Sequence, residues 1–157
     1  MKYFNKKNGF SLLELLIVIL IIIGLATISA VAVNSQRAKA RDAKRISDIR
    51  QIQTALEFYK SDEGDYLLVA DPIILGKEQV KLCGKAEGGF VSASKECKEA
   101  STYMTAIPTD PLNGKDYFYS GTAETYDLQF TTERQSILGV AGTYFAHPNS
   151  TDLTPSL

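Results

Sequence analysis

The sequence is poor in the residues on which most catalytic and metal sites depend. Its 157 residues include two cysteines, one histidine and no tryptophan. The histidine, His147, precedes a proline and has no nucleophile or base near it in the sequence, so we interpret it as a surface residue. We therefore expect no enzyme activity, no cofactor and no metal ion. The formal net charge of −1 excludes a general attraction to nucleic acid or to an anionic membrane surface.

The two cysteines are too few for a disulfide scaffold. Cys83 and Cys97 also lack the CxxC or Cys/His spacing of a zinc site. They form either one bridge or two unpaired buried thiols. In an oxidising compartment, a bridge across a loop of about 15 residues would stabilise the fold by about 3 kcal/mol.

Charge is absent from a long segment near the N-terminus. Met1 to Gly9 form a polar leader with three lysines and no acidic residue, which we do not expect to fold. The residues that follow are almost wholly apolar, and Leu15 to Val33 contains no charge. As a helix with a rise of ~1.5 Å per residue, this stretch would extend roughly 28 Å and could cross a bilayer core. The alternative is a secretory signal peptide cleaved near Ala30 or Ala32.

Proline and glycine are also absent between Val33 and Gly64, so we expect the same helix to continue into water. Five apolar residues recur there at intervals of three or four: Ile46, Ile49, Ile52, Leu56 and Tyr59. This narrow stripe needs a surface to pack against, and the rest of the chain must supply it. Gly64 is predicted to end the helix.

The remainder of the chain is rich in turn residues. Tyr117–Tyr119 and Tyr126–Thr131 have strand character, and the connection through Gly121 favours a hairpin. Val140–Ala146 is either strand or loop. The patterns together predict an α+β protein in which one long helix packs on a small antiparallel sheet.

We divide the chain into four segments on this basis. Residues 1–9 are the leader, and residues 10–33 are the transmembrane half of the helix. Residues 34–61 are its outer amphipathic half, and residues 65–157 form a loop-rich head.

One short segment indicates a function. The stretch Lys6 to Leu16, which reads KKNGFSLLELL, resembles the prepilin leaders of type IV pilins and of the pseudopilins of type II secretion and DNA-uptake machines. A basic leader ends at Gly9, the aromatic Phe10 follows, and Glu14 is the fifth residue of the processed chain. The resemblance implies a pilin-like fold, cleavage between Gly9 and Phe10 by a prepilin peptidase on the cytoplasmic face, and N-methylation of Phe10.

The resemblance also implies how the subunits assemble. Glu14 would pair with the Phe10 amine of a neighbouring subunit, since an unpaired carboxylate beside lipid is costly. The apolar helices would pack through five residues: Leu12, Leu13, Leu16, Ile17 and Leu20. The expected protein is a structural filament subunit, made as a single-pass membrane protein with a cytoplasmic N-terminus and an extracytoplasmic head, and assembled on an inner-membrane platform. Export favours the Cys83–Cys97 bridge. The alternative is a monomeric, signal-anchored binding domain that acts as an adhesin or sensor.

A basic cluster follows the apolar run: Arg37, Lys39, Arg41, Lys44, Arg45 and Arg50. The positive-inside rule would place it in the cytoplasm, but the leader requires a cytoplasmic N-terminus and takes precedence. We interpret the cluster as a solvated helix face that pairs with acidic residues of neighbouring subunits, with nucleic acid or lipid headgroups as the alternative partners.

Calcium ligands are not evident in the head. The acidic, glycine-rich calcium loop of major secretion pseudopilins is missing after Phe130, which leaves pilus and pseudopilus both open. We interpret Asp110, Asn113 and Asp116 as turn residues, because they lack the alternate spacing of a calcium loop.

Overall fold

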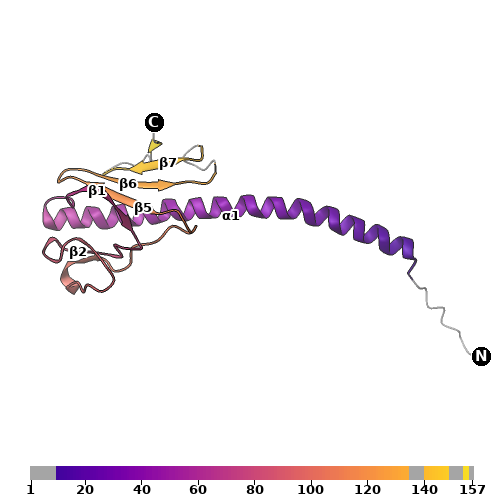
Figure 1. Cartoon of the computed structure of the whole chain (residues 1–157), viewed down its shortest axis with the longest axis horizontal. Helices are drawn as coiled ribbons and strands as arrows, with labels where there is room; N and C mark the ends of the chain where they lie inside the picture. The colour runs from indigo at the N-terminus through magenta and orange to yellow at the C-terminus, as the bar shows by residue number, and fades with distance from the viewer. Residues whose placement is uncertain (1–9, 135–139, 149–153, 156–157) are drawn as a thin grey trace, which may run out of the picture. The chain divides into compact units, whose positions relative to one another are not determined.

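The computed structural model describes residues 10–134, 140–148 and 154–155, and it gives no account of the side chains of residues 28–32 and 154–155. The predicted leader, Met1 to Gly9, lies outside the described residues. The chain divides into two compact units, Met1–Arg37 and Ala38–Leu157. Helix α1 (Leu12–Glu63) contributes residues to both units (Figure 1).

Helix α1 ends where the sequence predicts. Gly64 has a positive φ of 90°, which glycine adopts without a steric penalty. Its N–H donates to the carbonyl of Lys60 at 2.9 Å, and this bond satisfies one of the last free carbonyls of the helix. Within the described part of the chain, no helix combines the length and the apolarity of a membrane span.

A five-stranded antiparallel sheet packs on the C-terminal part of α1, and Figure 1 shows β5, β6 and β7 beside it. The strand order is β1-β5-β6-β7-β8. The strands are β1 (Val69–Leu75), β5 (Tyr117–Gly121), β6 (Tyr126–Thr131), β7 (Thr143–Ala146) and β8 (Thr154–Pro155). The predicted hairpin is confirmed as β5–β6, and the ambiguous segment Val140–Ala146 provides β7.

The two outer strands of this sheet both contain a proline. In β1, the pairing register with β5 shifts between Val69 and Ile73, around Pro72. Proline has no N–H to donate, so it interrupts the ladder and is confined to edges and bulges. The sequence analysis missed β1 because Pro72 and the following Gly76 suggested a loop. At the other edge, β8 ends in Pro155.

The core of the head is the interface between α1 and this sheet. All five residues of the predicted apolar stripe are at most 7% exposed, which confirms that the stripe faces the rest of the chain. The sheet contributes aromatic side chains to the same cluster: Tyr117, Tyr119, Tyr126, Phe130 and Tyr144. Edge-to-face contacts such as Tyr66 with Tyr126, 4.8 Å between ring centroids, add directional packing.

A second, smaller sheet has the strand order β3-β2-β4 and occupies residues that the sequence analysis left unassigned. Its strands are β2 (Lys81–Cys83), β3 (Phe90–Val91) and β4 (Thr102–Met104), with 3-10 turns η1 (Lys85–Glu87) and η2 (Glu99–Ser101) between them. We call residues 81–104 the disulfide lobe.

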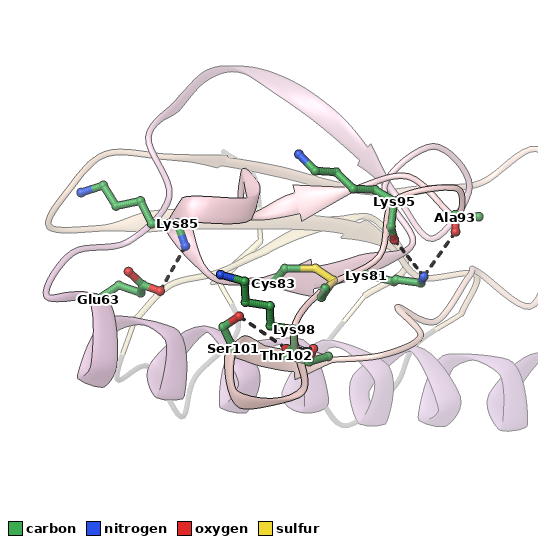
Figure 2. Close-up of a disulfide and its surroundings, with 10 residues drawn as sticks. Glu63, Lys81, Cys83, Lys85, Ala93, Lys95, Lys98, Ser101 and Thr102 are labelled. Carbon is green, nitrogen blue, oxygen red and sulfur yellow. Dashed lines mark hydrogen bonds between the residues drawn. A yellow bond between two sulfur atoms is a disulfide. The ribbon is translucent and has the colours of Figure 1, made fainter.

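The lobe is closed by a disulfide between Cys83 and Cys97, whose Cα atoms are 5.7 Å apart (Figure 2). The backbone N–H of Lys85 donates to the Glu63 carboxylate at 3.1 Å. The lobe is thereby held to the last residue of α1, as Figure 2 shows for Lys85 and Glu63.

We predict that replacing both cysteines by serine lowers the free energy of unfolding by about 3 kcal/mol, because the unfolded chain regains the freedom of the closed loop. Urea unfolding measures the loss. Reduction with dithiothreitol should lower the free energy of unfolding of the wild-type protein by the same amount. It should not change that of the double variant. A non-reducing peptide map of the exported protein should contain the joined Cys83 and Cys97 peptides, and recovery of both cysteines as free thiols would refute the bridge.

Candidate assembly site

The N-terminal part of α1 exposes a continuous apolar surface. The five predicted packing residues, Leu12, Leu13, Leu16, Ile17 and Leu20, are all exposed, from 46% for Leu16 to 82% for Leu12. Phe10, which precedes the helix, is 80% exposed. An apolar surface of this length is costly in water, so it requires lipid or the apolar surfaces of other proteins as its partner.

Glu14 is the only charged residue between Phe10 and Gln36. It lies in the first turn of α1, where the positive end of the helix dipole favours a carboxylate. Its side chain is exposed, and among the described residues it takes part in no ion pair. The structure therefore leaves Glu14 available to a cation from another molecule. Its pairing with a neighbouring Phe10 stays a prediction.

The head contains a charge network that the sequence analysis did not find. Its centre is Arg45, a residue of α1 whose side chain is fully buried. Its guanidinium donates two hydrogen bonds to Asp110, Nε to Oδ2 at 2.6 Å and Nη2 to Oδ1 at 2.8 Å. Nη1 lies 2.6 Å from Asp42 and 2.7 Å from Glu133. Burial lowers the pKa of Arg45, but the hydrogen bonds to these three carboxylates outweigh that effect and raise it.

The same network fixes the chain that leaves β6. Arg41 donates to both carboxylate oxygens of Glu133, at 2.8 Å and 2.6 Å. These bonds are the largest influence on Glu133 and lower its pKa to about 2. Asp42 in turn accepts the backbone N–H groups of Glu133 at 3.0 Å and of Arg134 at 3.1 Å. Side chains of α1 therefore hold the start of the β6–β7 connection.

A second buried carboxylate on α1 reaches the sheet. Asp48 accepts the hydroxyl of Tyr117 at 3.0 Å and pairs with Lys44 at 2.8 Å. Burial, followed by the charge of Asp48, raises the pKa of Tyr117, so this phenol stays protonated and continues to donate. The interpretation of the basic cluster as a wholly solvated face is therefore wrong for Arg45, and Arg41 and Lys44 find partners within their own chain.

A sequence signal for the network does exist. The residues Ala38, Asp42, Arg45, Ile49, Ile52, Leu56 and Tyr59 follow one another at alternating intervals of four and three, and all are buried. Asp42 and Arg45 thus stand on the apolar stripe, extended toward the N-terminus. Charges at core-facing positions require buried partners. The sequence analysis began the stripe at Ile46, so it did not include Asp42 and Arg45.

The side chains of the β6–β7 connection offer no free carboxylate to a calcium ion. Glu133 is the only acidic residue between Phe130 and Thr143, and both of its oxygens are bound by arginine. Across the described ranges, no three Asp, Glu, His or Cys side chains lie close enough to hold a metal ion. Asp110 accepts the N–H of Leu112 at 2.8 Å, as a turn residue does, but it also serves as a partner of Arg45.

Comparison with known proteins agrees with this architecture. A family model described as the prokaryotic N-terminal methylation motif matches residues 4–31. With the long helix and its antiparallel sheet, this motif defines a pilin-like structural subunit of a helical filament, processed at its leader. No solved structure matches the chain significantly.

The similarity to curated proteins is more specific. The type II secretion system core protein G of Escherichia coli (strain K12) is 38% identical over 130 residues, which cover 82% of this chain and 83% of that protein. The protein of the same name from Vibrio cholerae is 27% identical over 136 residues, 82% of this chain and 84% of that protein. The chain belongs to the family of type II secretion system core protein G, the major pseudopilins.

We predict that Arg45→Met lowers the free energy of unfolding by about 3–5 kcal/mol, because it leaves buried carboxylates without their cation. The matched control is Arg50→Met, which removes an exposed guanidinium from the same helix and should change stability by no more than about 0.5 kcal/mol. Urea unfolding followed by near-ultraviolet circular dichroism measures both. Equal, small losses for the two variants would show that the network does not hold the head together.

Proposed function

We propose that this protein is the major subunit of a type II secretion pseudopilus. The observation that carries the proposal is the exposed apolar N-terminal part of α1, in which Glu14 is the only charge before Arg37 and most of which lies within the match to the methylation motif over residues 4–31. The identity to core protein G over most of both chains points to the same machine. The function of the protein is to assemble with other copies into this filament.

Processing is the first step of this function. A prepilin peptidase removes Met1 to Gly9 at the cytoplasmic face, and the new amine of Phe10 is methylated. Cleavage creates a cation at the start of α1. That cation and the Glu14 carboxylate are both costly next to lipid when unpaired, and each satisfies the other when they belong to neighbouring subunits.

Assembly is the second step. Before it, residues 10–33 lie in the inner membrane, with the N-terminus in the cytoplasm and the head outside. An assembly platform in that membrane then transfers the subunit into the filament, where lipid contacts are replaced by contacts between apolar helices. The hydrophobic effect does not separate these two states, so shape, close packing and the Glu14 ion pair decide the equilibrium.

Processing is tested by the mass of the mature chain. Protein from the membrane and filament fractions should begin at Phe10, lack the first nine residues and carry one methyl group on the Phe10 amine. The same measurement on a Gly9→Leu variant, in which the leader should be retained, serves as the control. A mature N-terminus near Val33 would instead identify an ordinary secreted protein.

Assembly is tested by Glu14→Leu. Removing the carboxylate makes the segment a better membrane anchor, but it leaves the incoming Phe10 amine unpaired at a cost of about 3–5 kcal/mol, so filament yield should fall by roughly a hundredfold or more. The variant should still be inserted and cleaved. Filaments sheared from cells that contain only this variant are compared with subunit retained in the membrane.

The matched control for this variant is Glu124→Leu, which makes the same substitution at an exposed position in the turn between β5 and β6. It should assemble normally. Wild-type yields from Glu14→Leu would exclude the ion pair, and a wild-type protein that is anchored but never polymerises would favour an adhesin or sensor domain.

A further inference from the structure

The C-terminal part of α1, which belongs to the second compact unit and starts at Ala38, exposes one face over four turns. This face has basic but no acidic side chains. This cationic face consists of Lys39, Ala40, Ala43, Lys44, Ser47, Arg50, Gln51 and Thr54. The helix does carry acidic residues here, but Asp42 and Asp48 point into the head, where Asp42 binds Arg45 and Asp48 binds Tyr117. The buried charge network therefore removes the negative charges from this surface.

Two cations of this face have no countercharge among the residues that the structure describes. Lys44 is paired with Asp48 at 2.8 Å. By contrast, no ion pair between described residues involves Lys39 or Arg50. A shallow groove with a volume of about 370 Å³ runs beside Arg50, lined by Ala43, Ile46, Ser47, Gln51 and Thr54. The face thus offers both positive charge and a recess to a partner.

Complementary charge lies at the other end of the same helix. Asp62, in the last turn of α1, and Asp65, just after it, are exposed, and neither forms an ion pair within the described ranges. The neighbouring acids are already engaged: Glu57 accepts the hydroxyl of Tyr66 at 2.8 Å, and Glu63 accepts the N–H of Lys85. Tyr103 also hydrogen-bonds to the Asp62 carboxylate, but its hydroxyl carries no positive charge. The acidic end of α1 therefore has two exposed carboxylates, Asp62 and Asp65, that no cation of the described residues neutralises.

These two surfaces cannot meet within one chain. Arg50 precedes Asp62 by twelve helical residues, which corresponds to about 18 Å, and Lys39 precedes it by about 35 Å. They can meet between two copies that lie parallel and are displaced along the helix axis by a distance in this range. Copies in the proposed filament are parallel, because each enters it from the same membrane with its N-terminus on the same side.

We propose that the cationic face of one subunit binds the acidic end of α1 in a second copy, and that this contact sets the axial displacement between neighbours at about 18–35 Å. The proposal rests on the filament function proposed above. A second copy fits better than a lipid surface, because anionic headgroups would use the cations but leave the two aspartates without a role. Charge complementarity of this kind fixes register and rejects wrong alignments.

The test is charge reversal in the full chain, expressed as the only copy. One variant combines Lys39→Glu with Arg50→Glu, a second combines Asp62→Lys with Asp65→Lys, and a third contains all four changes. Each two-residue variant places like charges opposite one another and should lower the yield of sheared filaments by about tenfold or more. The four-residue variant restores opposite charges with their signs exchanged and should recover filaments to near the wild-type yield.

The matched control combines Lys95→Glu with Lys98→Glu, two exposed lysines of the disulfide lobe, and changes the net charge by the same amount as the cation reversal. It should assemble normally. All altered residues are exposed, so each head should unfold at the wild-type temperature, which separates an assembly defect from misfolding.

The outcomes separate a failure of this inference from a failure of the proposed filament function. Wild-type filaments together with normal yields from both two-residue variants, or no recovery in the four-residue variant, would overturn the inference and leave the function standing. A wild-type chain that forms no filaments would overturn both. If only the cation reversal impairs assembly, and the same variant loses flotation with phosphatidylglycerol vesicles but not with phosphatidylcholine vesicles, the partner is a headgroup and the inference fails.

Discussion

Arg45 is a cation that water does not reach, and its countercharges come from three separate parts of the chain. Asp42 lies one turn away on α1, Asp110 lies in the connection that leads to β5, and Glu133 follows β6. A buried cation with any of these missing is strongly disfavoured. The helix and both connections must therefore be in place together. The network joins α1 to the sheet by directional bonds, in addition to the apolar packing that surrounds it.

The sequence predicts the features whose signal is local. The isoleucine stripe, the end of α1 at Gly64 and the β5–β6 hairpin each rest on residues within a few positions of one another, and the structure contains all three. The leader motif is equally local. It indicated a pilin-like subunit and left pilus and pseudopilus both open, a choice that the similarity to core protein G then narrowed.

The features that the sequence did not predict depend on distant partners or on very short elements. Arg45 and Asp110 are separated by 65 positions, and Arg41 and Glu133 by 92, so the sequence near the arginines does not show their partners, although the extended stripe places Arg45 on the face that packs on the sheet. The strands of the disulfide lobe have two or three residues, too few for an alternating pattern to be read. In β1, Pro72 is a turn signal that tertiary pairing with β5 overrides.

The prolines at the two edges of the large sheet have a consequence for a protein made to polymerise. An open sheet edge is a template for strand addition, and a crowded filament would bring many such edges together. Pro72 in β1 and Pro155 in β8 each place a residue without an N–H in an edge strand, and β8 has only two residues. Strand addition between heads is thus disfavoured at both edges, which leaves the exposed helix surface as the favoured route of self-association.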